Sequence, residues 1–362
     1  MVTRVSFLLL TFALNWISLK AQDGIFHAIT GEDLTDQLDS LIRTRDFDFF
    51  EDEAPLELTL STDYKKLIKE KDKDQYQPAL LKYQPDDTLL IQKEIRVKAR
   101  GAFRKKYCQF PPIKLNFKHT EFRVESLQTL KSLKLVTNCR YTKTYEQYIL
   151  KEYLAYRVLN VLTDKSFKVR LIRITYEDTS GKFKPNTRFA FIIEEAKSLA
   201  ARHHAVLYDK QMLSPKRTQW EHMLLIDVFQ FMIGNTDWSV PGLHNMKLIK
   251  IQELNEPSPY AIPYDFDYTG LVNAIYAVPP EMLPIESVTQ RLYRGFCPTP
   301  QELNQTLEIF KDNQQEILEL YANSSYLDSR HRKEAINYLN EFFNIIDQPN
   351  RVKKNILQNC RK

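Results

Sequence analysis

The sequence predicts an α+β fold whose first half is rich in strands and whose second half is mainly helical. Three observations predict it: alternating segments that begin at Leu56, an apolar stripe at helical spacing over residues 145–162, and an apolar segment over residues 220–233 that ends at a glycine. The chain has 362 residues, of which 43% are hydrophobic and 12% aromatic. It is therefore long enough to bury a large core.

Strands are predicted where apolar and polar residues roughly alternate and β-branched residues are frequent. In the first 140 residues these segments are LELTLS, TLLIQKEIRVKARG, PPIKLNFK and SLKLVT. A charged segment, KKLIKEKDKDQYQPALLKY, connects the first two. The helix over residues 145–162 follows, and then two more strands, FKVRLIRITYED and TRFAFIIEEA, which are joined by a turn around Ser180 and Gly181.

The second half begins with the segment over residues 220–233, which is apolar on almost every side and predicts a central buried helix. Gly234 suits the C-terminal end of that helix. After a polar loop, NMKLIKI and YAIPYDFD predict a short hairpin. The tetrapeptide TPQE at residues 299–302 forms a capping box with proline at the first helical position, so a helix is expected from there to about residue 322. A last helix is predicted over about residues 329–346.

The N-terminal residues, MVTRVSFLLLTFALNWISLKAQ, have the features of a secretory signal peptide. Arg4 supplies the positive charge, residues 5–17 form the apolar part, and Ala21 is a small residue for cleavage. The apolar part is shorter than the ~20 residues that a membrane-spanning helix needs. We therefore expect a signal peptide over residues 1–21, no transmembrane segment after its cleavage, and an exported protein in the periplasm, at the cell surface or outside the cell.

Four cysteines in an exported chain are candidates for disulfide bonds. Cys108 and Cys139 each end a segment next to a predicted strand, and two adjacent strands would bring them together. Cys108–Cys139 is therefore the preferred pair, and Cys297 and Cys360 would then pair by default. Four cysteines allow three connectivities, so the pairing stays open at this point. Without a C-x-x-C motif or clustered histidines, a zinc site is not expected.

The charge balance gives no reason to expect nucleic-acid binding. The net charge is +5, and the 51 lysines and arginines are interleaved with 46 acidic residues. This composition is typical of a solvated surface of mixed charge.

Residues suited to phosphoryl transfer occur in the loop after the buried helix and at both ends of the predicted hairpin. The reaction needs a lysine on a strand for the phosphates, a carboxylate near the attacking hydroxyl, and oxygen ligands for magnesium. Asp237 follows the buried helix in the loop GNTDWSVPGLHN, Asn245 stands at the start of the hairpin, and Asp265 and Asp267 end it in YDFDYTG. A hairpin would bring Asn245 and Asp265 close together, and their oxygens suit magnesium.

These two segments, GNTDWSVPGLHN followed by PYDFDYTG, resemble the paired signature of the CotH family, which are exported, atypical kinases named for a spore-coat protein. KARGAFRKKYCQFPPIKLNF resembles the family's arginine-glycine turn before a basic strand, and SLKLVTN, EYLAYRVL and FAFIIEE resemble the elements that follow. The resemblance covers roughly residues 55–290. It implies a bilobal, divergent protein-kinase-like fold, with a β-rich N-terminal lobe that contains one main helix and a mainly helical C-terminal lobe.

The composition of the ends of the chain and the resemblance together divide the chain into five parts. After the signal peptide, residues 22–55 would form an N-terminal extension and residues 56–196 the N-terminal lobe. Residues 197–350 would form the C-terminal lobe, with the catalytic loop and the metal-binding hairpin, and residues 351–362 a basic tail.

Position by position, the resemblance assigns roles to the residues of the loop and hairpin. Asp237 resembles the catalytic aspartate that accepts or orients the proton of the substrate hydroxyl. Asn245 resembles the metal-binding asparagine, and Asp265 stands where the DFG aspartate would. Asp267 would support the metal ligands without contacting the ion, or would be an alternate metal ligand.

The phosphate-binding lysine and its supporting glutamate are assigned in the same way. Lys114, on the predicted IKL strand, is the candidate lysine, with Lys98 and Arg100 as competitors. Glu152 would steady this lysine from the helix, and Glu146 is the alternative.

The remaining nucleotide contacts are assigned to the hinge and to the arginine-glycine turn. Glu194 and Glu195 fall where the adenine-contacting hinge would lie. No G-x-G-x-x-G loop is present, so Arg100 and Arg104 around Gly101 would hold the phosphates.

The resemblance thus implies an enzyme that binds ATP and Mg²⁺ (or Mn²⁺) and transfers the γ-phosphoryl group to a hydroxyl, on a serine or threonine of an exported protein. Asn245 stands eight positions after Asp237, whereas an ordinary protein kinase has five, and Asn235-Thr236 replaces the usual histidine-arginine pair. Two alternatives therefore stay open: a catalytically inactive kinase-fold protein of the envelope or surface that binds a partner, and a kinase for a small molecule, sugar or lipid.

Overall fold

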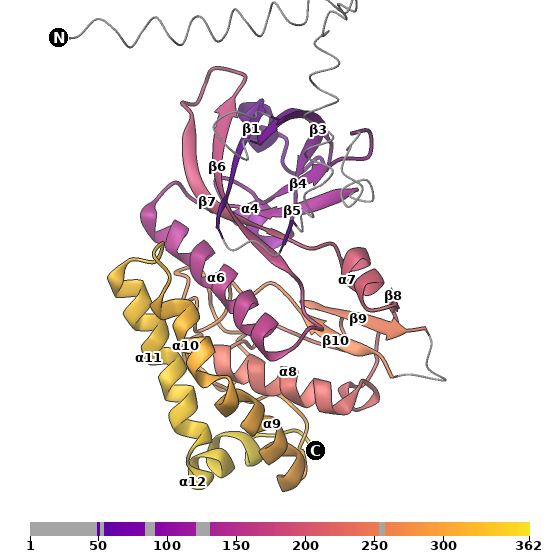
Figure 1. The fold of residues 1–362 in the computed structure, drawn as a ribbon, viewed down its shortest axis with the longest axis vertical. Helices are drawn as coiled ribbons and strands as arrows, with labels where there is room; N and C mark the ends of the chain where they lie inside the picture. The colour runs from indigo at the N-terminus through magenta and orange to yellow at the C-terminus, as the bar shows by residue number, and fades with distance from the viewer. Residues whose placement is uncertain (1–48, 51–53, 84–90, 121–130, 253–257) are drawn as a thin grey trace, which may run out of the picture. The chain divides into compact units, whose positions relative to one another are not determined.

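Seven strands of the first half of the chain close into a mixed β-barrel (Figure 1). The computed structural model describes residues 49–50, 54–83, 91–120, 131–252 and 258–362. The predicted signal peptide and most of the predicted N-terminal extension lie outside these residues. In chain order the barrel strands are β1 (Leu56–Thr62), β2 (Gln77–Tyr83), β3 (Ile91–Ala99), β4 (Ile113–Asn116), β5 (Ser132–Val136), β6 (Val169–Asp178) and β7 (Asn186–Ile193).

The barrel closes through a parallel pairing of β1 with β6. Around the barrel the order is β1-β2-β3-β4-β5-β7-β6, and every other neighbouring pair is antiparallel. The parallel register runs from Leu56 opposite Ile172 to Thr62 opposite Asp178. Leu60 and Ile172 are fully buried. The pairing gives both strands a hydrogen-bonded neighbour on each side, so neither is left as an edge.

Within the described residues, four helices accompany the barrel strands. They are α3 (Tyr64–Lys69), α4 (Phe103–Tyr107), α6 (Lys143–Leu162) and α7 (Ala196–Arg202). The longest, α6, packs against β6 and β7 on one side and against α10 on the other. This double packing explains why α6 buries residues around most of its circumference, including Glu152 and Lys151.

The second half contains a small sheet and a group of helices (Figure 1). The antiparallel sheet has the order β10-β9-β8, and helix α8 packs against β10 and α9. Helix α11 packs against α10 and α8. The elements are β8 (Ala205–Leu207), α8 (Trp220–Ile233), β9 (Met246–Ile251), β10 (Tyr260–Pro263), α9 (Pro300–Asp312), α10 (Gln314–Ala322), α11 (Ser329–Ile346) and α12 (Pro349–Val352), with short 3-10 and π-helical turns at Pro215–Arg217 and Lys353–Leu357.

Several local predictions are confirmed in this half. Helix α8 ends at Gly234, whose φ of +66° is in the left-handed region that glycine adopts without strain. Thr299 and Glu302 form both hydrogen bonds of the predicted capping box. The predicted hairpin is the antiparallel pair β9–β10.

The predicted fold class is wrong. The described residues do not form a bilobal, kinase-like fold whose β-rich lobe carries one main helix, because seven strands close into a mixed barrel that is accompanied by several helices. Alternation in the sequence identifies strands but not their partners. The pairing that closes this barrel joins Leu56 to Ile172, which are far apart in the chain, and no local pattern encodes that contact.

All four cysteines are paired, as predicted. Cys108 bonds to Cys139 and Cys297 bonds to Cys360, with Cα–Cα distances of 4.6 and 4.9 Å. This oxidised state is compatible with an exported protein. Separately, none of the described helices has both the length and the apolar character needed to cross a bilayer.

Asp227, in the middle of α8, is an ionisable group buried without a hydrogen-bond partner among the described residues. It is 1% exposed, and burial raises the pKa of its carboxyl to about 8. Because this value lies above that of the unfolded chain, the carboxyl stabilises the fold fully only at low pH, and its contribution is lost as the pH rises from about 4 to about 8.

We therefore expect Asp227→Asn to be more stable than the wild type at pH 8, by on the order of a few kcal/mol since one pKa unit is worth about 1.4 kcal/mol. At pH 4.5 the two proteins should be nearly equally stable. Urea unfolding at both pH values measures the difference, with the exposed Asp312→Asn as a control that should not change the profile. Equal pH profiles for Asp227→Asn and the wild type would contradict the prediction.

Candidate functional site

The loop after α8 and the hairpin β9–β10 bring three predicted site residues together. Asp237 lies in the loop, Asn245 directly precedes β9, and Asp265 follows β10 by one residue. Tyr264 donates its backbone N–H to the carbonyl of Asn245 at 3.0 Å, so the two sides of the hairpin stay hydrogen-bonded up to the neighbour of Asp265. As the sequence predicted, Asn245 and Asp265 lie at the same end of the hairpin.

Asp237 is held by two side chains of its own loop. Its Oδ1 hydrogen-bonds to His244 Nε2 at 2.8 Å, and its Oδ2 accepts a hydrogen bond from Asn245 Nδ2 at 3.0 Å. Asn245 Nδ2 also donates to the backbone carbonyl of Asp237 at 2.8 Å. The Asp237 side chain is 33% exposed, so its carboxylate is fixed in direction and still accessible.

Asn245 and Asp265 both have left-handed backbone conformations, with φ of +50° and +68°. Asparagine and aspartate adopt this region more readily than other non-glycine residues, but it still costs free energy. Asp265 is held there by a 2.7 Å hydrogen bond from its backbone N–H to the hydroxyl of Tyr156 on α6. No described residue forms a hydrogen bond or an ion pair with the Asp265 carboxylate. Strained residues with unused polar atoms are a feature of ligand sites.

Among the described residues, three cationic side chains lie close to Asp265 or to its neighbour Tyr264. Lys134 of β5 and Lys247 of β9 lie over the ring of Tyr264, with their Nζ atoms 5.2 and 6.0 Å from its centroid. Arg100 is close enough to Asp265 and Lys134 for its charge to act on both. Within the described part of the chain, none of the three cations forms a hydrogen bond or an ion pair through its side chain.

The positive charges of Arg100, Lys134 and Lys247 repel one another. Burial lowers the pKa of Lys134 to about 8, and the neighbouring charges of Arg100 and Lys247 lower it further. Burial also lowers the pKa of Arg100, which Asp265 partly offsets. Cations that crowd in this way are stabilised when an anion binds between them.

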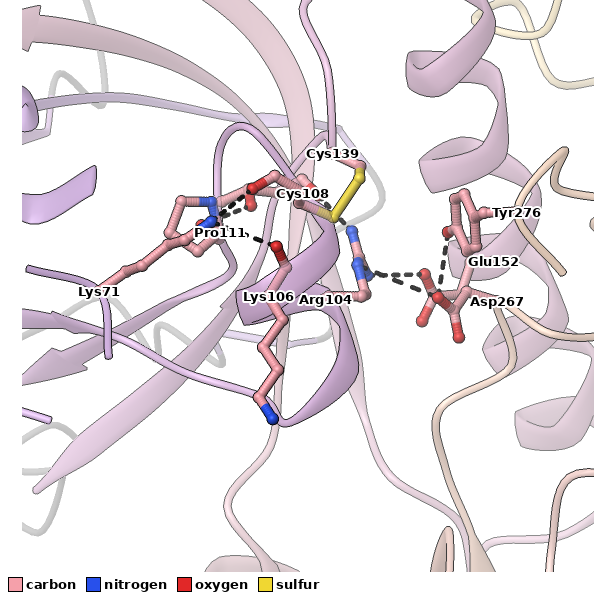
Figure 2. Close-up of a disulfide and its surroundings, with 10 residues drawn as sticks. Lys71, Arg104, Lys106, Cys108, Pro111, Cys139, Glu152, Asp267 and Tyr276 are labelled. Carbon is pink, nitrogen blue, oxygen red and sulfur yellow. Dashed lines mark hydrogen bonds and ion pairs between the residues drawn. A yellow bond between two sulfur atoms is a disulfide. The ribbon is translucent and has the colours of Figure 1, made fainter. Parts of the chain in front are cut away.

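Arg104, Glu152 and Asp267 form a buried charged network between α4, α6 and the segment after β10 (Figure 2). Arg104 Nη1 lies 3.6 Å from Glu152 Oε2, and its Nε lies 4.0 Å from Asp267 Oδ2. The Tyr276 hydroxyl donates to Asp267 Oδ2 at 3.0 Å, and Arg104 donates to the carbonyl of Thr137. The predicted phosphate ligand Arg104 is therefore already occupied by protein groups.

Two carboxylates share one cation in this network. Burial raises the pKa of Glu152 well above its usual range, and the charge of Asp267 raises it further. The pKa of Asp267 is raised by burial and by Asp265, while Arg104 lowers the pKa of both carboxyls. Glu152 thus pairs with an arginine rather than with Lys114, and Asp267 points into the network (Figure 2).

Lys114 lies in the middle of a row of three lysines. The register places Lys98 opposite Lys114 and Lys114 opposite Lys134, so the three share one face of β3, β4 and β5. Lys98 forms an ion pair with Asp74 at 2.8 Å, which lowers the pKa of that carboxyl, and Lys114 adds a smaller contribution. Lys134 is close enough to Asp265 for that carboxylate to raise the pKa of the lysine, against the larger lowering by burial.

The predicted hinge glutamates are occupied by other protein groups. Glu194 accepts two hydrogen bonds from Arg202, at 3.2 and 2.9 Å, and one from the backbone N–H of Lys168 at 3.1 Å. Glu195 accepts a hydrogen bond from the Ser132 hydroxyl. Glu146, the alternative helix glutamate, accepts the backbone N–H of Phe189 at 2.9 Å.

The described residues of the site suit a magnesium ion whose ligands come partly from the protein and partly from a bound triphosphate. Among the described residues, no three Asp, Glu, His or Cys side chains are grouped to hold a metal by themselves. Magnesium bound together with a triphosphate needs only one or two protein carboxylates, because phosphate oxygens and waters complete its coordination. The unpaired carboxylate of Asp265 and the Oδ1 atom of Asn245 provide suitable hard oxygen donors.

Sequence reasoning missed four residues of this site: Lys134, Lys247, Tyr264 and Tyr156. Lys134 had a detectable signal, because SLKLV and PPIKL place a lysine at the same step of two strands. Which of the two lysines approaches the hairpin depends on strand order, and the sequence did not supply that order. The buried hydroxyl of Tyr156 had no signal beyond its place in an apolar helix.

A cavity of about 630 Å³ lies apart from these residues. Its lining, which includes Ser61, Ala79, Ile95 and His119, contains none of the predicted site residues that the structure describes. Most of its lining comes from β1, β2 and β3, and no charged cluster comparable to the one around Asp265 is present among its described residues. The chemistry of the hairpin site, and not cavity size, therefore identifies the candidate site.

Comparison with known proteins adds no family. A scan against protein-family models and a search of curated proteins found no match to this chain.

Proposed function

We propose that this protein is an exported phosphotransferase that binds ATP with Mg²⁺ (or Mn²⁺) and transfers the γ-phosphoryl group to a hydroxyl, on a serine or threonine of an exported protein. The proposal rests on the chemistry of the site and not on the fold, because one fold can carry many activities. The observation that carries it is the arrangement of three cationic side chains that form no hydrogen bond or ion pair with the described residues, close to the carboxylate of Asp265, which also forms none with them.

Arg100, Lys134 and Lys247 would contact the phosphates. Their charges repel one another, and a triphosphate supplies the anion that removes the repulsion. Arg100 is suited to bind two phosphate oxygens at once, whereas each lysine acts as a point charge. This assignment keeps Arg100 from the sequence-based expectation and replaces Lys114 with Lys134.

Asp265 and the Oδ1 atom of Asn245 would hold the magnesium ion. When bound, the ion neutralises charge on the phosphate oxygens. Asn245 also links the two halves of the site, because its Nδ2 atom donates to the Asp237 carboxylate.

Asp237 would orient the acceptor hydroxyl. The hydroxyl oxygen attacks the γ-phosphorus, the bond from that phosphorus to the β–γ bridging oxygen breaks, and ADP leaves with the electron pair. The hydroxyl proton passes to Asp237, whose carboxylate is directed by His244 and Asn245.

Binding of ATP with Mg²⁺ tests the proposal directly. We expect the melting temperature of the full chain to rise with ATP and Mg²⁺ and to change little with ATP and EDTA, since ligand at a hundred times its Kd adds about 2.7 kcal/mol of stability. Lys134→Met should weaken MgATP binding by about tenfold or more, as a lost charge-assisted contact is worth roughly 1.5–3 kcal/mol.

Lys98→Met is the matched control, because Lys98 lies on the same face of the sheet but is paired with Asp74. It should bind MgATP like the wild type. No binding by the wild type would overturn the proposal. Equal binding by Lys134→Met and wild type would overturn the assigned phosphate site.

A further inference from the structure

The loop that carries Asp237 is held from outside by an arginine near the C-terminal disulfide. Arg294 Nη1 donates hydrogen bonds to the carbonyls of Thr236 and Trp238, the second at 3.2 Å. The two carbonyls belong to the residues directly before and directly after Asp237. The Arg294 guanidinium also lies 5.6 Å from the centroid of the Trp238 ring.

We propose that Arg294, braced by the Cys297–Cys360 disulfide, is a positioning residue for Asp237. The catalytic consequence of this inference rests on the proposed function. The brace itself, Arg294 with the segment that the Cys297–Cys360 disulfide anchors, is a property of the fold. Arg294 contacts the backbone on both sides of Asp237 and would not touch the substrate.

The loop has its own internal hydrogen bonds, and Arg294 completes them. Asp237 donates its backbone N–H to Asn235 Oδ1 at 2.9 Å, and the Trp238 indole donates to the Asn235 carbonyl at 3.2 Å. Asn235 is fixed in turn by a 2.9 Å hydrogen bond to Gln230 of α8. Arg294 binds the carbonyl of Thr236, and Asn245 Nδ2 binds the carbonyl of Asp237, so both peptide units next to Asp237 are held. The bond from Arg294 to the Trp238 carbonyl holds the following unit as well.

The segment that carries Arg294 is itself anchored to the last residues of the chain. Arg361 donates its backbone N–H to the carbonyl of Gly295 at 2.8 Å. Cys297 donates its backbone N–H to the carbonyl of Arg361, also at 2.8 Å. The disulfide between Cys297 and Cys360 closes this pairing. The Arg361 guanidinium lies 4.7 Å from the centroid of the Phe296 ring.

The same segment packs directly on α8, the helix from which the Asp237 loop emerges. A Cβ atom at Gly295 would lie 2.4 Å from Asp227 Oδ2 and 2.5 Å from the Tyr293 hydroxyl, so a larger residue there would force these buried side chains to shift. The brace is therefore short and tightly packed: Arg294 lies between Tyr293, which is buried, and Gly295. If the backbone pairing of Gly295 and Cys297 with Arg361 is lost, we expect the hydrogen bonds of Arg294 to weaken first.

The test uses Trp238 as a probe of its own loop. Hydrogen exchange of the Trp238 indole N–H is measured by NMR in the full chain, with the resonance assigned by Trp238→Phe. We expect exchange to accelerate by about tenfold or more in Arg294→Gln and in the double variant Cys297→Ser/Cys360→Ser. Arg294→Lys, which keeps the charge and can bind one carbonyl, should restore part of the protection.

Two matched controls separate the brace from general destabilisation. Arg332 also donates to two carbonyls, those of Ser324 and Leu327, but away from this loop, so Arg332→Gln should leave Trp238 exchange unchanged. Cys108→Ser/Cys139→Ser removes the other disulfide and should do the same. Unchanged Trp238 exchange in both Arg294→Gln and the Cys297→Ser/Cys360→Ser variant would overturn the proposal.

The catalytic consequence has a separate readout. We expect Arg294→Gln to lower the kcat of phosphoryl transfer by about tenfold or more while the KM for MgATP stays nearly constant, because the phosphate-binding residues are not moved. Faster Trp238 exchange with an unchanged kcat would overturn the positioning role. If the wild type transfers no phosphoryl group, the proposed function fails, and the exchange data alone decide whether the brace exists.

Discussion

Asp237→Asn is expected to lower the rate of phosphoryl transfer by about 10²–10⁴-fold, the contribution usual for a general base or hydroxyl-orienting carboxylate. Asparagine has nearly the same shape, and its Oδ1 can still accept the hydrogen bond from Asn245. It cannot take up the proton of the acceptor hydroxyl. The loss should therefore appear in the rate of transfer, with the affinity for MgATP nearly unchanged.

The rate can be measured without a known acceptor, as release of phosphate from ATP to water and as incorporation of labelled phosphate into added exported proteins. Asp312→Asn is the control, because Asp312 is an exposed aspartate at the end of α9 and far from the site in sequence. Wild-type transfer rates in Asp237→Asn would remove Asp237 from the mechanism and leave the phosphate and metal assignments to stand on the binding data.

Arg104→Met is expected to lower the free energy of unfolding by about 3–5 kcal/mol, since it leaves two buried carboxyls without their cation. Arg104 is 8% exposed and faces both Glu152 and Asp267. Its guanidinium also binds the carbonyl of Thr137, which the variant leaves unpaired. Methionine fills a similar volume, so the loss measures the charge and the hydrogen bonds more than a cavity.

The loss should depend on pH in a defined direction. Arg104 lowers the pKa of Glu152 and of Asp267, so removing it raises both. A folded-state pKa above the unfolded value stabilises the fold at low pH and ceases to do so as the pH rises. The Arg104→Met defect should therefore be smaller at pH 5 than at pH 8.

Urea unfolding at the two pH values measures both effects. Arg140→Met, an exposed arginine beside Tyr145, should change stability by no more than about 0.5 kcal/mol. Adding Glu152→Leu to Arg104→Met should recover part of the loss, because one unpaired carboxyl is then gone. A pH-independent defect, or no recovery in the double variant, would contradict the ion-pair explanation.

The sequence predicted well those features that depend on neighbouring residues. Gly234 at the end of α8, the capping box at Thr299, and the hairpin that joins Asn245 to Asp265 follow from local backbone preferences, and all are present. The pairing of Cys108 with Cys139 also follows from strands that are close in the chain.

Features that depend on distant contacts were predicted poorly. Whether Lys114 or Lys134 approaches Asp265 depends on which strand of the barrel lies nearest the hairpin. Glu152 was expected to bind a lysine because its position on the helix resembles that of a kinase glutamate, and instead it binds Arg104. The barrel itself was not predicted, because its closure depends on the pairing of β1 with β6. Local helix and strand patterns do not indicate which strands pair.

The parallel contact between β1 and β6 has a consequence for how this protein is made. During synthesis, β1 leaves the ribosome well before β6. Its second neighbouring strand, β6, is complete only once Asp178 has been synthesised. During that interval the strand has an open edge that other chains could join. Factors that bind extended segments of the growing polypeptide should therefore raise its yield, and the charged residues between β1 and β3 should help to keep the waiting chain apart from its copies.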